Sequence, residues 1–201
     1  MNVDVIKIAK YDPTFGGKYS RYQGYCISTS EKAEPILVPE ACTELKQMLS
    51  SRNIVTGFFF HSTLKRGVET ANCILSLGAS IMPCDDLNEI PFSLESLLSE
   101  EEFNREGSNL VRSRFVQAFI DDKLLIKRNE IQDRVKRTLS LVKYVEQDFP
   151  SVGIISHSFF MKILEAEVKG NSVFLSPERL REVIPFDQKT YPFGGGFSFE
   201  V

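Results

Sequence analysis

Residues 58–78 read FFFHSTLKRGVETANCILSLG and combine two periodicities. Residues 54–60 (IVTGFFF) are mostly apolar on both faces, which predicts a strand buried inside a sheet. Apolar residues then recur at positions 68, 71, 74, 75 and 77, which is the spacing of a helix. A buried strand therefore leads almost directly into a helix, and the junction between them includes the polar residues His61, Ser62, Lys65 and Arg66.

The same order of strand, polar junction and helix recurs along the chain. Residues 3–9 (VDVIKIA) and 152–156 (VGIIS) predict strands, and residues 197–201 predict a last, edge strand. Helical spacing follows in residues 40–51, 130–149 and 159–168. This alternation predicts an α/β fold, a three-layer sandwich around a mostly parallel sheet. Because ligands bind at the carboxyl ends of such strands, where helix N-termini also point, we expect the strand ends to form one anion-binding pocket.

Three segments do not fit this alternation. Residues 11–25 are rich in glycine and tyrosine, which predicts a long loop. Residues 83–127 contain an acidic stretch and no clear strand, so we expect a small cap inserted into a single domain of residues 1–201. Residues 194–196 are three glycines without a following helix, which predicts a turn into the last strand rather than a phosphate loop.

The composition is that of a globular chain, with 201 residues, 42% hydrophobic and 25% charged. A net charge of −3 gives no reason to expect a nucleic acid or an anionic membrane as a partner. The four cysteines form no C-x-x-C pair, so we expect reduced thiols and neither a metal nor a cofactor. Without a signal peptide or an apolar run of about 20 residues, a soluble cytoplasmic protein is expected.

Five segments resemble motifs of the histidine phosphatase superfamily, also called phosphoglycerate mutase-like. STLKRGVETA (62–71) is similar to its S-x-L-x-R strand end followed by T-A, and GIISHSFFMKIL (153–164) is similar to its V-S-H-G segment. LNEIPFSLESLLSEEEF (87–103) resembles L-x-E-I-x-F-G-x-W-E-G-x-S, and SRYQGY (20–25) resembles the R-x-Q-G of the first loop. NEIQDRVKRTL (129–139) lies where the family has a helix beginning E-S-x-x-x-x-x-R. The resemblance implies a histidine phosphatase-like sandwich.

The resemblance also implies roles for single residues. Arg66 would bind the phosphate, for which its planar guanidinium is suited, and Ser62 would belong to the same binding segment. His157 would hold and protonate the phosphoryl oxygens. Glu89 matches the acid–base carboxylate that donates to the leaving oxygen. Arg21 matches a loop arginine that reaches the substrate.

The first strand departs from the family. There it ends in R-H-G, and the histidine is the nucleophile that takes the phosphoryl group. Counting back from residues 21–24 sets Lys10 over the arginine and Tyr11 over the histidine, whereas a register one residue earlier sets Ala9 and Lys10 there. Lys10 would keep the positive charge for substrate binding. Tyr11 is a poor nucleophile because its ordinary pKa is near 10. His61 is the other candidate, if its side chain points into the pocket.

Three functions remain open at this point. The first is binding of a phosphorylated small molecule or an inorganic anion without phosphohistidine chemistry. The second is an active phosphomonoesterase with a rebuilt nucleophile, or one in which His157 or Glu89 activates water, with Glu95 as the alternative to Glu89. The third is a non-catalytic protein-interaction domain. The missing histidine favours the first, because a fold alone does not determine function.

Overall fold

The computed structural model describes residues 1–29, 36–54, 56–184 and 191–201. At its centre is a five-stranded sheet with the strand order β3–β2–β4–β1–β5. β5 runs antiparallel to β1, whereas the other neighbouring strands are parallel, so the predicted mostly parallel sheet and its edge strand are confirmed. The strands are β1 (Asn2–Lys7), β2 (Phe58–His61), β3 (Ser80–Pro83), β4 (Ser151–Ser156) and β5 (Gly196–Glu200).

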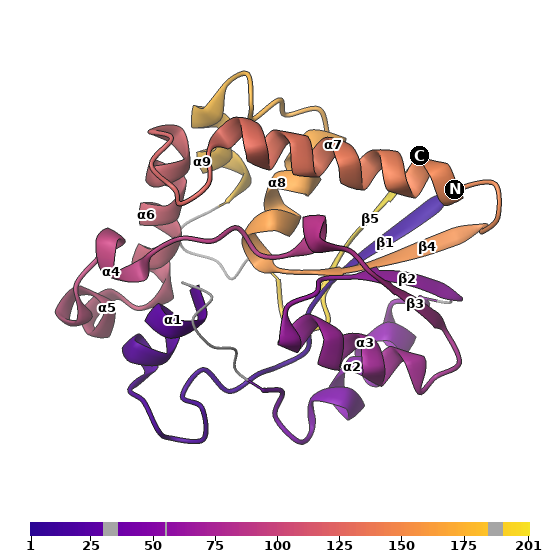
Figure 1. The fold of residues 1–201 in the computed structure, drawn as a ribbon, viewed down its shortest axis with the longest axis horizontal. Coiled ribbons are helices and arrows are strands. Elements are labelled where there is room, and N and C mark those ends of the chain that lie inside the picture. The colour runs from indigo at the N-terminus through magenta and orange to yellow at the C-terminus, as the bar shows by residue number, and fades with distance from the viewer. Residues whose placement is uncertain (30–35, 55, 185–190) are drawn as a thin grey trace.

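Helices cover both faces of the sheet, which confirms the three-layer sandwich (Figure 1). α2 (Ala41–Ser51) and α3 (Lys65–Leu75) lie on one face, and α7 (Arg128–Val145) and α8 (Ser158–Val168) lie on the other. The helix predicted over residues 130–149 exists but ends at Val145. Two short helical elements follow α8, namely η2 (Pro177–Arg179) and α9 (Leu180–Val183).

Successive residues of the interior strands pack into two separate hydrophobic cores. In β2, Phe58 and Phe60 join the core under α7 and α8, whereas Phe59 packs with Ala71 and Ile74 of α3. Side chains alternate between the two faces of a strand, and both faces are covered here. This explains why residues 58–60 are all aromatic instead of alternating between apolar and polar.

The segment predicted as a cap is largely helical, and its part from residue 94 to residue 120 lies beyond one end of the sheet, beside α1 (Arg21–Thr29) (Figure 1). Its elements are η1 (Asp85–Leu87), α4 (Leu94–Leu97), α5 (Glu100–Glu106) and α6 (Ser108–Ile120). The prediction of a loop over residues 11–25 is wrong for its last part, because α1 begins at Arg21. The cause is a reciprocal cap: the Ser20 amide donates to the Gln23 side chain at 3.0 Å, and the Gln23 amide donates to the Ser20 hydroxyl at 3.2 Å.

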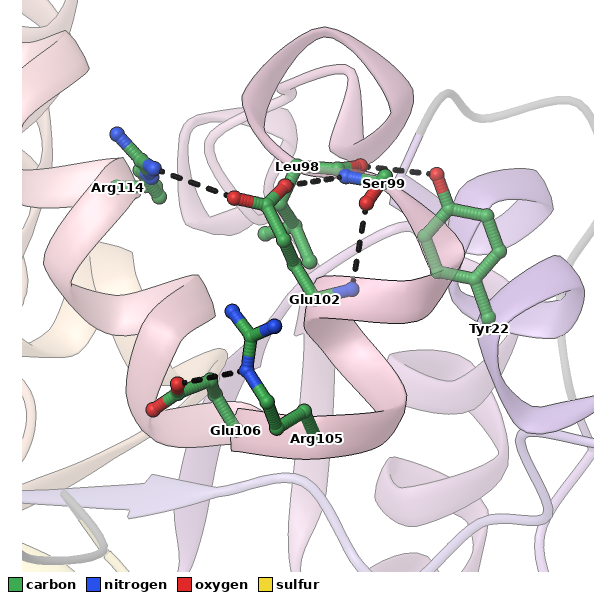
Figure 2. A network of polar contacts seen from close by, with 7 residues as sticks. All are labelled: Tyr22, Leu98, Ser99, Glu102, Arg105, Glu106 and Arg114. Atoms are coloured by element: carbon green, nitrogen blue, oxygen red, sulfur yellow. Dashed lines mark hydrogen bonds and ion pairs between the residues drawn. The ribbon is translucent and has the colours of Figure 1, made fainter.

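Polar contacts join α1 to the helices that follow (Figure 2). The Tyr22 hydroxyl donates to the Leu98 carbonyl at 3.0 Å. Ser99 and Glu102 cap the start of α5 reciprocally, with amide-to-side-chain distances of 3.2 and 2.8 Å. Glu102 also pairs with Arg114 of α6 at 3.5 Å. These contacts hold α1, α5 and α6 together as one group of helices.

The structure corrects one expectation about the cysteines. Cys42 of α2 and Cys73 of α3 form a disulfide, so the prediction of four reduced thiols is wrong for this pair. Cys26 and Cys84 take no part in a disulfide. The turn predicted at residues 194–196 is present, with Gly194 at a φ of 72° two residues before β5, which begins at Gly196. Within the part of the chain that the structure describes, no helix is long and apolar enough to cross a membrane.

Candidate functional site

The carboxyl ends of β2, β4 and β1 meet at one edge of the sheet, because these three strands are parallel neighbours. Lys7 pairs with Ser156, and the amide of Ile8 donates to the Ser156 carbonyl at 2.9 Å. On the other side of β4, the amide of Ser62 donates to the Ile155 carbonyl at 3.0 Å. The convergence of the polar strand ends is therefore confirmed for the backbone.

A cavity of about 370 Å³ lies beside this edge. Its walls come from the end of β1, the loop after it, α1, the start of α3, residues 89–92, α5, α6, the start of α8 and residues 191–193. Half of the predicted site residues line it: Tyr11, Arg21, Arg66 and Glu89.

Arg66 and Tyr11 face one another in this cavity. Arg66 is the second residue of α3 and is 6% exposed, and its guanidinium carbon lies 5.8 Å from the centre of the Tyr11 ring. Burial, followed by the nearby Tyr25 phenol, raises the pKa of Tyr11 far above 10.0, although Arg66 opposes the shift. The Tyr11 phenol therefore keeps its proton at neutral pH and is suited to donating a hydrogen bond rather than to nucleophilic attack.

Glu89 connects the cavity to the first turn of α8. Its carboxylate accepts hydrogen bonds from the amides of Phe159 at 3.3 Å and Phe160 at 3.0 Å. Burial raises the pKa of Glu89 above 4.5, while the backbone hydrogen bonds and Arg66 oppose the shift. Glu95, the alternative carboxylate, is instead exposed on α4.

His157 lies behind the cavity wall, in a hydrogen-bonded chain. Its Nε2 is 2.8 Å from the Ser62 Oγ, which donates to the Asn88 Oδ1 at 2.7 Å. Because the hydroxyl gives its only proton to Asn88, the hydrogen of the His157 ring is on Nε2. Burial, followed by the charges of Arg66 and Lys7, lowers the pKa of His157 well below 6.5, so the ring is neutral. Ser62 and His157 are both buried, and neither belongs to the described lining of the cavity.

His61 and Lys10 are not brought to the cavity. His61 shares the buried face of β2 that carries Phe59, and its Nδ1 lies 2.9 Å from the carbonyl oxygen of the next residue. Lys10 is 41% exposed at its side chain and pairs with Glu40 at 3.3 Å and Glu44 at 3.7 Å. Neither residue belongs to the described lining of the cavity, although their backbones are close in sequence to the site.

Two further cations line the cavity that the sequence did not predict. Lys7, the last residue of β1, donates to the Tyr191 carbonyl at 3.4 Å, and its Nζ lies 4.5 Å from the centre of the Phe193 ring. Arg112 of α6 is buried and donates to the Asn109 side chain. The position of Lys7, a charged residue within the apolar run of β1, could have indicated a role at the site. No motif in the sequence indicated one for Arg112.

The described residues of the lining include four cations and a single carboxylate, so the cavity carries a positive charge. Partial burial strengthens the attraction between such charges and an anion, because the local dielectric constant is lower than in water. Guanidinium groups bind phosphate or carboxylate through two parallel hydrogen bonds. The arrangement is therefore suited to holding an anionic ligand. The four cations are Lys7, Arg21, Arg66 and Arg112.

The model of the histidine phosphatase superfamily (branch 1) matches residues 40–176, well over half of the chain. The protein belongs to this superfamily, as the motifs predicted. The matched range includes Arg66, Glu89 and His157 but begins after β1. Among curated proteins, no sequence matches this chain.

Several solved structures share the fold. YhfR of Bacillus stearothermophilus superposes with a TM-score of 0.66 at 13% identity, covering 100% of this chain and 91% of YhfR. The alpha-ribazole phosphatase of Shigella flexneri gives 0.60 at 18% identity over 90% and 84% of the chains. A mutant phosphoserine phosphatase of Entamoeba histolytica in complex with phosphoserine gives 0.53 at 14% identity, again over 90% and 84%. At these identities the likeness concerns the fold.

Proposed function

We propose that this protein binds a phosphorylated small molecule or an inorganic anion in the cavity and does not form a phosphohistidine. The observation that carries the proposal is the set of four cations around the cavity, with Arg66 at the sheet edge as the main phosphate-binding group. Membership of a superfamily with phosphatases among its structural relatives supports a phosphorylated ligand.

The residues at the strand ends support the absence of a phosphohistidine. Among the described residues of the lining there is no histidine. Ile8 follows Lys7, the last residue of β1, and its amide donates to the carbonyl of Ser156, the last residue of β4. A nucleophile at the end of β1 would therefore have to come from Ile8 or from the residues after it. Tyr11 reaches the cavity, but as a phenol with a raised pKa. Neither an isoleucine nor a protonated tyrosine replaces an imidazole as a nucleophile.

A phosphomonoesterase is the second candidate, and one observation favours it. Glu89 and Arg66 both line the cavity, and burial raises the pKa of Glu89. A carboxyl group that keeps its proton at higher pH is a better general acid for a leaving oxygen. In this alternative the nucleophile would be water.

Two measurements on the purified protein separate these functions: calorimetric titration with phosphate and a panel of phosphomonoesters, and phosphate release from the same esters. We expect binding without release above background. Arg66→Gln should weaken binding by at least about tenfold, since hydrogen bonds to charged groups contribute about 1.5–3 kcal/mol. The matched control is Lys65→Gln, which changes the exposed neighbouring cation of α3.

Equal binding by the wild type and Arg66→Gln would refute the proposed anion site. Phosphate release by the wild type that Glu89→Gln abolishes would establish the phosphomonoesterase instead. Melting temperatures of both variants show whether they remain folded, and the Lys65→Gln control shows whether removing any cation from this helix has the same effect.

We further propose that residues 83–127 form a cap on a single domain of residues 1–201, since α5 and α6 contribute Phe103 and Arg112 to the lining. A cytoplasmic location remains a prediction. The disulfide between Cys42 and Cys73 counts against it, because cytosolic thiols are normally kept reduced.

A further inference from the structure

The cavity is much larger than the anion that it is proposed to hold. Its volume is about 370 Å³. A phosphate group exposes four oxygens, and a water-sized group takes about 30 Å³. Most of the cavity therefore remains for the organic part of a ligand, and the side chains around that space should determine which organic part fits.

Aromatic side chains surround this space, and six of them form three contacting pairs from distant parts of the chain. Two pairs are edge to face and the third is tilted, which are the arrangements that aromatic rings prefer. An additional ring placed among them can adopt the same geometries. The pairs, with the distances between ring centres, are Tyr11–Phe193 at 5.6 Å, Tyr25–Phe103 at 5.7 Å and Phe92–Phe159 at 5.6 Å.

Three of the four cations that line the cavity lie over these same rings. The Lys7 Nζ is 4.5 Å from the centre of the Phe193 ring. The guanidinium carbons are 5.8 Å from the Tyr11 ring for Arg66 and 5.9 Å from the Tyr25 ring for Arg21. A ligand whose anionic group reaches Lys7 and Arg66 therefore brings the atoms next to that group against aromatic surfaces. These distances couple recognition of the anion to recognition of the ligand body.

We propose that the ligand is a phosphomonoester with an aromatic or heteroaromatic body. This inference rests on the proposed function, because it assigns the phosphate to the cations of the cavity. A planar ring would remove Phe193, which is 37% exposed, from water and add ring contacts with Tyr11. A short polyol body would instead lose water from its hydroxyl groups against ring faces that offer few hydrogen bonds.

The test compares methylphosphonate with benzylphosphonate by NMR titration. Both carry the same head group on a carbon–phosphorus bond that a phosphomonoesterase does not cleave, so binding is measured whether or not the protein is catalytic. We expect benzylphosphonate to bind at least about tenfold more tightly. Equal affinities would overturn the inference and leave the anion site standing. Failure of both compounds to bind would overturn the proposed function, and with it the inference.

Variants locate the preference in the cavity. Phe193→Leu keeps an apolar side chain but removes a ring, and it should reduce the ratio of the two affinities by several-fold while methylphosphonate binding changes much less. Tyr144→Leu is the matched control, because it removes an aromatic side chain that is 79% exposed on α7, outside the lining. An unchanged ratio in Phe193→Leu, or an equal reduction in the control, would contradict the assigned surface.

Discussion

The two walls of the cavity are held by different kinds of contact. On the sheet side, partly buried hydrogen bonds fix the junction before α3: the Asn88 Oδ1 accepts from the Ser62 hydroxyl at 2.7 Å and from the Thr63 amide at 2.8 Å. On the helical side, α5 and α6 are joined by a pair between Glu102 and Arg114 that is largely exposed to water. Buried polar groups cost more to leave unpaired than exposed ones. The sheet-side wall should therefore be the stiffer of the two.

Breaking the sheet-side wall should have the largest effect. Asn88→Ala leaves the Ser62 hydroxyl and the Thr63 amide without their acceptor, so we expect the free energy of unfolding to fall by about 2 kcal/mol or more. Urea denaturation measures this change. Asn129→Ala, at an exposed asparagine that caps only the amide of its neighbour Glu130, is the matched control. Similar losses in the two variants would contradict the assignment of the stiffness to the junction.

The pH dependence of stability tests the same wall without removing Asn88. The pKa of His157 is lowered in the folded state, so its stabilising contribution is complete above pH 6.5. As the pH falls below 6.5, the unfolded chain takes up a proton that the folded chain does not. Stability is then lost by up to about 1.4 kcal/mol per pH unit. Thermal melts across this range should show a shallower decline for His157→Gln than for the wild type.

Glu89 changes the stability of the protein with pH in the opposite direction to His157. Its raised pKa means that its contribution is present below pH 4.5 and is lost as the pH rises through the raised value. The comparison of His157→Gln with the wild type removes this common contribution, because both proteins keep Glu89. Equal slopes for the wild type and His157→Gln would show that the ring is not held neutral.

The smallest effect is expected in the helical wall. Ser99→Ala removes the hydroxyl that caps α5, and such caps contribute about 1 kcal/mol. Urea denaturation should therefore show a smaller loss than for Asn88→Ala. Ser96→Ala is a nearby control, since its hydroxyl donates to the Ser93 carbonyl instead of accepting from an amide. A loss in Ser99→Ala as large as in Asn88→Ala would show that the two walls do not differ.

The sheet-side wall was largely predictable from the sequence. Apolar runs mark β1, β2 and β4, and parallel strands end at one edge, so a pocket could be expected there. The resemblance to the family then implied that Arg66 and Glu89 belong to it. The direction of single side chains was not predictable in the same way. A shift of one residue exchanges the two faces of a strand, and this is what turns His61 toward α3. Lys7 lines the cavity, whereas the expected Lys10 pairs with α2 and its cap.

The helical wall was predictable only in outline. A small cap was expected over residues 83–127, but the inward position of Arg112 depends on how α6 packs, and no local pattern in the sequence predicts that packing. The start of α1 did have a local signal, because Ser20 and Gln23 have the spacing of a reciprocal cap. No local signal in the sequence predicted the disulfide between Cys42 and Cys73, because this bond requires α2 and α3 to lie side by side.

That disulfide also changes what kind of polymer the chain is before it folds. The bond closes a covalent ring of residues 42–73, which leaves residues 1–41 and 74–201 as two tails. Of the described strands, β2 alone lies within the ring, and both of its partners in the sheet, β3 and β4, belong to the C-terminal tail. β1 comes from the N-terminal tail and lies between β4 and β5, which both belong to the C-terminal tail. The oxidised chain therefore assembles its sheet around a closed ring, with one tail supplying both neighbours of the enclosed strand.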